Sequence, residues 1–279
     1  MANWFDEIYD ENSRIGLKYK RVLFSGQSDF QKVDVIETEG FGNALLLDGC
    51  WMTCEKDEKT YHEPIVHLPF AVAPSIERVL IIGGGDGGTA REVLRYPEVK
   101  HVDMVEIDGL VVEVAKKYLT KIGSSFDDPR LNVHIDDGIA WVTDGNHAPY
   151  DVIIVDGADP AGPAEGLFNE AFFQACERCL KPDGVLTTQA ESPDMMRDIH
   201  IAMIETIAKV FPITRPYYGS VQIYPGAQWS WIYASKRVEP TDIIDARIAH
   251  VENDTWLYNR EVHHAMLAIP NHIKRAIAR

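Results

Sequence analysis

Short, nearly continuous apolar runs alternate with helix-like segments between residues 75 and 236. The apolar runs read RVLIIG, VDMVEID, NVHI, YDVIIVD and GVLTTQ, and the segments between them include GTAREVLRY and LVVEVAKKYL. Strands that are apolar on both faces and separated by helices are typical of a parallel sheet covered on both sides. The pattern therefore predicts an α/β fold with a mostly parallel sheet and helices on both of its faces.

The two ends of the chain have a different pattern. Residues 1–60 carry the β-rich runs YKRVLFSG, FQKVDVIETEG and NALLLDGCWMTC, separated by glycine and charged turns, which predict antiparallel hairpins. A final pair of antiparallel strands is expected after Phe211, and the chain beyond Pro240 is expected to be helical. We thus expect a small N-terminal β-hairpin domain over residues 1–60 and a larger α/β domain with a C-terminal helical extension over residues 61–279.

Composition and charge narrow the class of protein. The chain has 279 residues, of which 46% are hydrophobic, and a formal net charge of -16. This favours a globular protein and argues against a nucleic-acid partner, because phosphate contacts need a basic face. No stretch approaches the roughly 18 apolar residues of a membrane span, and the acidic opening MANWFDEIYDENSR lacks the layout of a signal peptide. We expect a cytoplasmic protein without a membrane partner, whose four cysteines are buried thiols rather than a metal or redox site.

A glycine-rich turn follows the first apolar strand of the expected sheet. The sequence VLIIGGGDGGTAREV places Gly83, Gly85 and neighbouring glycines between a strand and a helix, where backbone amides approach a ligand closely. Roughly 20 residues further on, the next strand ends in MVEID and leaves Glu106 where an acid can bind the hydroxyls of a ribose. This spacing favours a nucleoside ligand over a tight turn without a ligand.

Asp86 stands inside this glycine turn and changes the expected ligand. A pyrophosphate needs only amides at this place and would meet a carboxylate, so a dinucleotide is disfavoured. A nucleoside with a positive charge suits the turn better, and S-adenosylmethionine or a relative supplies both a sulfonium and an ammonium group.

Two further strands end in acidic residues. The third apolar strand is followed by Asp137 and Gly138, which suit the amino group of an adenine and the close approach of its ring to the backbone. The fourth ends in VIIVDGADP, with Asp156 and Asp159 three positions apart. Because open α/β sheets bind ligands at the carboxyl ends of their strands, both carboxylates are expected in one crevice, at the positively charged end of the nucleoside. Ordinary turn chemistry is the alternative for each acidic pair.

These motifs resemble the spermidine synthase family of aminopropyltransferases. The resemblance rests on GGGDGGTAREVLRYPEVKHVDMVEID, IDDG, DGADPAGPAEGLF, LLLDG and YHE, and it extends from WFDE near the start to IYP and YNREVHHAMLAIP. It implies a Rossmann-like, class I methyltransferase-like catalytic domain that moves the aminopropyl group of decarboxylated S-adenosylmethionine to putrescine. The products would be spermidine and S-methyl-5′-thioadenosine. The resemblance implies no bound cofactor and no metal, and it suggests a homodimer or a homotetramer.

The resemblance also implies roles for single residues. Asp156 matches the family's proton acceptor for a direct in-line attack, and Asp159 matches the neighbour that holds the acceptor amine. Contacts with the polyamine or the aminopropyl end are implied for His62, Asp86, Tyr61 and Tyr224. Contacts with the nucleoside are implied for Gln31, Glu106, Asp137, Gly138 and Pro163, beside Gly83 and Gly85 of the glycine turn.

Two other functions share part of this pattern. A diamine N-methyltransferase on the same type of fold would use intact S-adenosylmethionine, whose carboxylate Asp86 would repel. A non-catalytic polyamine-binding protein would have little use for Asp156 beside its ligand-holding acids. Three departures from the family's usual pattern bear on the acceptor amine more than on the reaction: Met52 in place of a glutamine, DGAD in place of DSTD or DSSD, and YPGAQWSW in place of YP.G..G.

Overall fold

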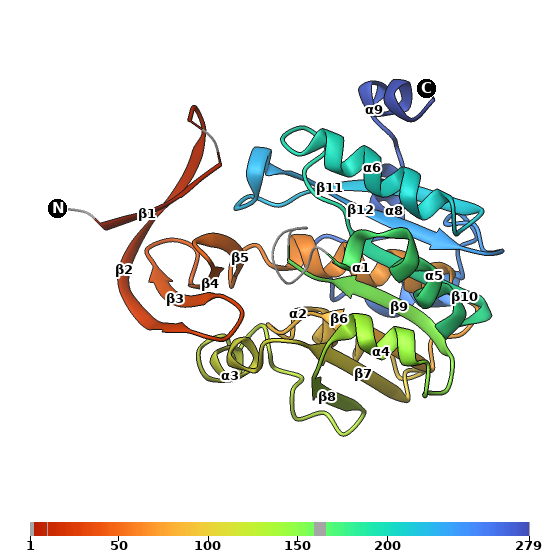
Figure 1. Cartoon of the computed structure of the whole chain (residues 1–279), viewed down its shortest axis with the longest axis horizontal. Helices are drawn as coiled ribbons and strands as arrows, with labels where there is room; N and C mark the ends of the chain where they lie inside the picture. Colours follow the sequence, from red (N-terminus) through yellow and green to blue (C-terminus); the bar gives the residue numbers. More distant parts are fainter. Residues whose placement is uncertain (1–2, 10, 159–165, 279) are drawn as a thin grey trace.

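The N-terminal part of the chain forms a curved antiparallel sheet at one end of the molecule (Figure 1). The computed structural model describes residues 3–9, 11–158 and 166–278, and five strands pair in chain order within this first sheet. They are β1 (Asn3–Ile8), β2 (Arg14–Gln27), β3 (Lys32–Thr38), β4 (Asn43–Leu47) and β5 (Cys50–Cys54). Asp48 and Gly49 join β4 to β5 with positive φ angles of 49° and 89°, the conformation that two-residue hairpin turns favour. The expected small antiparallel β-domain is therefore present.

A seven-stranded sheet forms the centre of the larger part of the molecule (Figure 1). The neighbouring strands β10, β9, β6, β7 and β8 are parallel, and β12 and β11 continue the sheet through antiparallel pairs. The bounds are β6 (Arg78–Gly83), β7 (His101–Glu106), β8 (Leu131–Ile135), β9 (Tyr150–Asp156), β10 (Leu180–Gln189), β11 (Ile213–Ser220) and β12 (Gln228–Ser235). The predicted mostly parallel, Rossmann-like sheet is confirmed.

Helices cover both faces of this sheet, because alternate side chains of its central strands point to opposite sides. Val79 and Ile81 of β6 belong to one core cluster with α1, α2, α3, α7 and α8, whereas Leu80 and Ile82 belong to another with α4, α5, α6 and α9. The bounds are α1 (Lys59–Val72), α2 (Gly88–Val93), α3 (Gly109–Tyr118), α4 (Gly138–Asp144), α5 (Glu170–Cys179), α6 (Arg197–Ala208), α7 (Asp245–Val251), α8 (Arg260–Met266) and α9 (Asn271–Ile277). None of these helices in the described part of the chain is long and apolar enough to cross a membrane.

The register of the central strands brings their carboxyl ends to one edge. Gly83 at the end of β6 lies opposite Asp156 at the end of β9, and Glu106 at the end of β7 lies opposite Ile135 of β8. The chain order reverses around β6, since β7 and β8 follow on one side of it and β9 and β10 on the other. Ligands of open α/β sheets bind in the crevice at such a reversal.

A buried carboxylate on α1 holds the C-terminal segment in place. Glu63 is fully buried and accepts hydrogen bonds from the backbone amides of Trp256, Leu257 and Tyr258, at 2.6, 2.7 and 2.9 Å. Charge-assisted hydrogen bonds of this kind are stronger than neutral ones. The C-terminal extension is thereby fixed to the helix whose first turn carries Tyr61 and His62.

Replacing Glu63 by Gln should lower the free energy of unfolding by about 2–4 kcal/mol. The side-chain amide keeps one acceptor oxygen but replaces the other by an NH2 group, which is a donor and would face backbone amides that also donate. Urea denaturation followed by circular dichroism measures the change. Glu261→Gln, an exposed glutamate in the first turn of α8, is the matched control and should change stability by less than about 0.5 kcal/mol. Equal stability of the two variants would mean that Glu63 does not secure the segment.

Candidate active site

A cavity of about 320 Å³ lies at the carboxyl ends of β6, β7 and β9, and residues of the N-terminal sheet complete its wall. All but two of the site residues expected from the sequence line this cavity. The other two, Asp159 and Pro163, lie outside the described residues. The expected residues that line it are Gln31, Tyr61, His62, Gly83, Gly85, Asp86, Glu106, Asp137, Gly138, Asp156 and Tyr224. The fold therefore brings together side chains that are far apart along the chain, while their individual roles stay predictions.

The glycine turn is shaped by its contact with the end of β9. Gly83 and Gly84 have positive φ angles of 83° and 71°, and the Gly84 amide donates a 2.9 Å hydrogen bond to the carbonyl of Asp156. A Cβ atom on Gly83 would lie 2.2 Å from that same carbonyl oxygen. The turn can approach the strand that carries Asp156 only because it has no side chain here.

Gly83→Ala should lower the free energy of unfolding by more than about 2 kcal/mol, since both its φ angle and the backbone contact oppose a side chain. Gly40→Ala is the control, because a Cβ atom at Gly40 meets nothing within 4 Å and its φ angle is not positive. Thermal unfolding of the two variants side by side makes the comparison. A Gly83→Ala protein as stable as Gly40→Ala would contradict the close approach.

Asp156 lies at the end of β9 with one hydroxyl on each carboxylate oxygen. Tyr61 donates its phenol hydrogen to Oδ1 at 2.6 Å, and Thr89 donates its hydroxyl hydrogen to Oδ2 at 2.6 Å. Burial raises the pKa of Asp156, and the hydrogen bonds and the nearby His62 oppose this rise without cancelling it. A carboxylate with a raised pKa is a stronger base than one in water.

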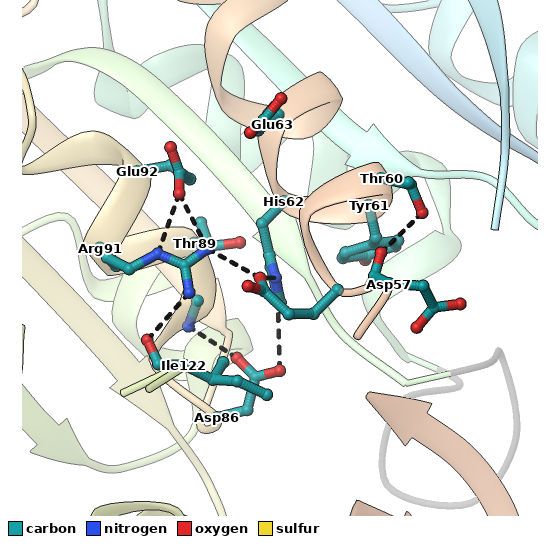
Figure 2. Close-up of polar contacts among 12 residues, drawn as sticks. Asp57, Thr60, Tyr61, His62, Glu63, Asp86, Thr89, Arg91, Glu92 and Ile122 are labelled. Carbon is teal, nitrogen blue, oxygen red and sulfur yellow. Dashed lines mark hydrogen bonds and ion pairs between the residues drawn. The ribbon is translucent and has the colours of Figure 1, made fainter. Parts of the chain in front are cut away.

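A chain of paired charges leads from the partly buried Arg91 to Asp86 (Figure 2). Arg91 donates to Glu58 at 2.7 Å, and Glu58 lies 2.7 Å from Nδ1 of the buried His62. Nε2 of His62 lies 3.3 Å from Asp86, whose other oxygen accepts the Gly88 amide at 2.8 Å. Because both ring nitrogens of His62 face carboxylates, the imidazole is protonated and donates on both sides.

His62 and Asp86 are both charged. Burial lowers the pKa of His62, but the carboxylates of Asp86 and Glu58 outweigh it, so the net pKa lies well above the usual value. Burial raises the pKa of Asp86, but His62 outweighs it and the net pKa is lowered. His62 therefore fixes Asp86 as an oriented, ionised carboxylate in the cavity, and its own contact with a polyamine stays a prediction.

Three acidic residues at the carboxyl ends of β7 and β8 lie in different settings, and two of them, Glu106 and Asp137, line the cavity. Glu106 accepts amide hydrogen bonds from Gly85 at 3.1 Å and from Asp108 at 2.9 Å, and burial raises its pKa to about 7. Asp108 caps α3 and accepts the side-chain amide of Gln31 at 3.0 Å, which ties the N-terminal sheet to this edge. Asp137 caps α4 through the amide of Ile139 and is exposed. Glu106 and Asp137 are thus the acids at the two strand ends that flank the crevice.

Aromatic rings and a thioether form another part of the wall. The rings of Tyr61 and Tyr224 meet edge to face with centroids 5.6 Å apart, and Tyr224 donates to the Met52 carbonyl at 2.5 Å. Met52 lines the cavity together with Leu47 and Cys50 from the β4–β5 hairpin. The position where the family's usual pattern has a glutamine therefore presents an apolar side chain to the cavity.

Sequence reasoning missed Thr89 and Glu58. Thr89 was part of the motif GGGDGGTAREV, but its contact with Asp156 spans 67 positions of the chain. Glu58 lies four positions before His62, the spacing that places two side chains on one face of a helix, and this spacing was an available signal.

The sequence of the chain is similar to family models and to known proteins. The family model described as the spermine/spermidine synthase domain matches residues 58–243, and that of the spermidine synthase tetramerisation domain matches residues 3–55. A polyamine aminopropyltransferase of Prochlorococcus marinus strain MIT 9313 is 52% identical over 233 residues, which cover 83% of this chain and 81% of that protein. One of Alkaliphilus metalliredigens is 42% identical over 280 residues, covering 99% and 98%.

Solved structures of spermidine synthases are also similar to this chain. A spermidine synthase in complex with the transition-state analogue AdoDATO superposes with a TM-score of 0.95 at 42% identity, covering 99% of this chain and 95% of that one. The spermidine synthase of Thermotoga maritima superposes with a TM-score of 0.92 at 40% identity, covering 99% and 94%. The resemblance expected from the sequence motifs is confirmed, and the chain belongs to the spermine/spermidine synthase family.

Proposed function

We propose that the chain transfers the aminopropyl group of decarboxylated S-adenosylmethionine to putrescine and releases spermidine and S-methyl-5′-thioadenosine. The observation that carries this proposal is one cavity that combines a nucleoside-type glycine turn with two acidic side chains, Asp86 and Asp156. A cationic nucleoside and a cationic amine suit such a cavity. The relatives named as aminopropyltransferases and the AdoDATO complex of a similar synthase support the same reaction.

The donor is proposed to lie along the strand ends. Glu106 accepts the ribose hydroxyls, with Gln31 beside it, and Asp137 accepts the adenine amino group. Gly83, Gly85 and Gly138 let the nucleoside lie against the backbone, and Pro163 is assigned to the adenine pocket from the family resemblance alone. The sulfonium and the aminopropyl chain then point toward Asp86 and Asp156. No bound cofactor and no metal enter this proposal.

The reaction is a single displacement. The amine nitrogen attacks the carbon beside the sulfonium, the carbon–sulfur bond breaks with its electron pair on sulfur, and the amine loses one proton. An alkyl amine with a pKa of about 10.4 is neutral in only about one molecule in a few thousand at pH 7, so the site must supply the free base. Asp156 takes the proton as the carbon–nitrogen bond forms, and its raised pKa suits this task. Positioning of the two reactants supplies much of the rate.

Putrescine fits the proposal as a diamine with one reacting and one distal nitrogen. The reacting amine lies beside the Asp156 carboxylate and the rings of Tyr61 and Tyr224, and Asp159 is assigned to hold the acceptor amine from the resemblance alone. Asp86, held by His62, faces the ammonium of the aminopropyl group.

A diamine N-methyltransferase remains the second candidate because the fold of the larger domain is shared by both reaction classes. Asp86 argues against it. Intact S-adenosylmethionine carries a carboxylate that the decarboxylated form lacks, and an ionised Asp86 repels this group.

Mass spectrometry of the products tests these functions directly. The purified protein is offered putrescine and other amines with decarboxylated and, separately, intact S-adenosylmethionine. An aminopropyl adduct together with S-methyl-5′-thioadenosine, formed only with the decarboxylated donor, is the expected result and names the preferred acceptor. A methylated amine formed with the intact donor would replace the proposal, and amine binding without any product would favour the polyamine-binding protein.

We further propose that the protein is a homotetramer built through its N-terminal domain, residues 1–60, with residues 61–279 as the catalytic domain. The proposal is supported by the tetramerisation family model on residues 3–55 and by exposed apolar side chains on the first sheet, Trp4, Ile8 and Val22. Light scattering coupled to size-exclusion chromatography gives the subunit number, and a dimer is the outcome that would correct it.

A further inference from the structure

Thr89 is a fully buried residue in the first turn of α2 and contacts the carboxylate proposed to take the proton. Its Oγ1 lies 2.6 Å from Oδ2 of Asp156, and its side chain has no exposed area. Oδ1 of the same carboxylate accepts the hydroxyl of Tyr61, which lines the cavity. Each oxygen of Asp156 therefore has its own donor, one from the cavity wall and one from the buried side.

Two donors on opposite oxygens hold a carboxylate in one rotational state. With Thr89 alone missing, Oδ2 would lose its buried partner, and the carboxylate could turn about its χ2 bond, which is a soft torsion. We propose that Thr89 is a positioning residue that fixes the Asp156 carboxylate for proton transfer and sets its basicity through this hydrogen bond. The inference rests on the proposed role of Asp156 as proton acceptor and adds a residue to it.

The hydrogen bond from Thr89 acts together with several other groups around Asp156. On α1, Tyr61 and the protonated His62 stabilise its charged form. In the glycine turn Asp86 destabilises it, and Glu106 at the end of β7 is a further acid within electrostatic reach. A donor to the carboxylate favours its ionised state, so loss of this donor must raise the pKa of Asp156.

Thr89→Val removes the hydroxyl and keeps the shape of the side chain. The acid limb of the pH–kcat profile should move to higher pH by about one unit, because a carboxyl that stays protonated to higher pH cannot accept the proton. At pH 7 kcat should fall by about tenfold while the KM for the nucleoside donor changes by less than about threefold. Thr89→Ser keeps the hydroxyl and should restore both the profile and kcat.

Thr187→Val is the matched control for a lost buried hydroxyl. Thr187 on β10 is also fully buried and lies 2.7 Å from the hydroxyl of Tyr217, away from the cavity. This variant should lose comparable stability and keep the wild-type pH profile. If Thr187→Val shifted the pH–kcat profile and lowered kcat as much as Thr89→Val, loss of stability alone would explain both changes, and the proposal would be overturned.

A second measurement keeps the inference separate from the proposed reaction. Carbon-13 NMR of labelled aspartate carboxyls, with the Asp156 signal assigned from Asp156→Asn, gives the pKa of Asp156 in the free protein. A higher value in Thr89→Val than in wild type and Thr89→Ser is expected even if the wild-type protein forms no aminopropyl product. An unchanged pKa overturns the role of Thr89, whereas a raised pKa without any aminopropyl product overturns only the proposed function.

Discussion

Asp156→Asn should lower kcat for aminopropyl transfer by about 10²–10⁴-fold, the range expected for loss of a positioned general base. The amide keeps the size of the carboxylate and can still accept a hydrogen bond from Tyr61 or Thr89 through its oxygen. It cannot take a proton from the attacking amine. Steady-state kinetics with saturating putrescine and decarboxylated S-adenosylmethionine measures the loss.

The same variant should bind the nucleoside almost normally, because Glu106 at the end of β7 and Asp137 at the N-terminus of α4 keep their backbone contacts. Calorimetric titration with S-methyl-5′-thioadenosine should give a Kd within about threefold of wild type. Asp136→Asn is the control, since Asp136 is an exposed acid at the same edge of the sheet and does not line the cavity. Lost nucleoside binding with normal turnover of the bound complex would assign Asp156 to binding rather than chemistry.

Asp86→Asn should reduce the preference for decarboxylated over intact S-adenosylmethionine by about 10–100-fold, on the order of 1.4–2.8 kcal/mol. In the proposed site, the ionised carboxylate would attract the ammonium of the decarboxylated donor and repel the carboxylate of the intact molecule. A neutral amide removes both effects. The donor should therefore bind more weakly, and intact S-adenosylmethionine should become a better competitor.

Competition titrations with both forms of the donor measure this change. Because Asp86→Asn also removes one of the two carboxylate partners of His62, His62→Gln belongs in the same experiment. His62→Gln leaves the carboxylate of Asp86 in the cavity, so it should keep a larger share of the discrimination. An unchanged preference in Asp86→Asn would exclude electrostatic selection by this residue.

The fold was predictable where the sequence pattern is local. The strands 78–83, 101–106 and 150–156 are nearly continuous apolar runs, and burial on both faces of a parallel sheet requires such runs. The start of β10 was less predictable, because its first five residues, LKPDG, resemble a turn. The pairing of β10 with β9 is also irregular in register between Leu180 and Val185. The alternating runs before residue 55 likewise predicted hairpins, since their turns contain glycine and aspartate.

The site was predictable to the extent that strand ends determine it. Glu106, Asp137 and Asp156 line one cavity because each lies at the carboxyl end of an apolar strand of the parallel sheet, and their roles stay predictions. The hydrogen bonds between Thr89 and Asp156 and between Glu58 and Arg91 were not predictable, because they depend on how α1 and α2 pack over the sheet. No periodicity in one sequence encodes that packing.

The attachment of Glu63 to residues 256–258 also sets an order of events while the chain is being synthesised. The carboxylate is made 193 to 195 residues before the amides that it binds. Until the ribosome has added these residues, burial of Glu63 lacks its hydrogen bonds and is unfavourable. We therefore expect the helix that carries Tyr61 and His62 to reach its final packing, and the active site its final arrangement, only after residues 256–258 have been added to the chain.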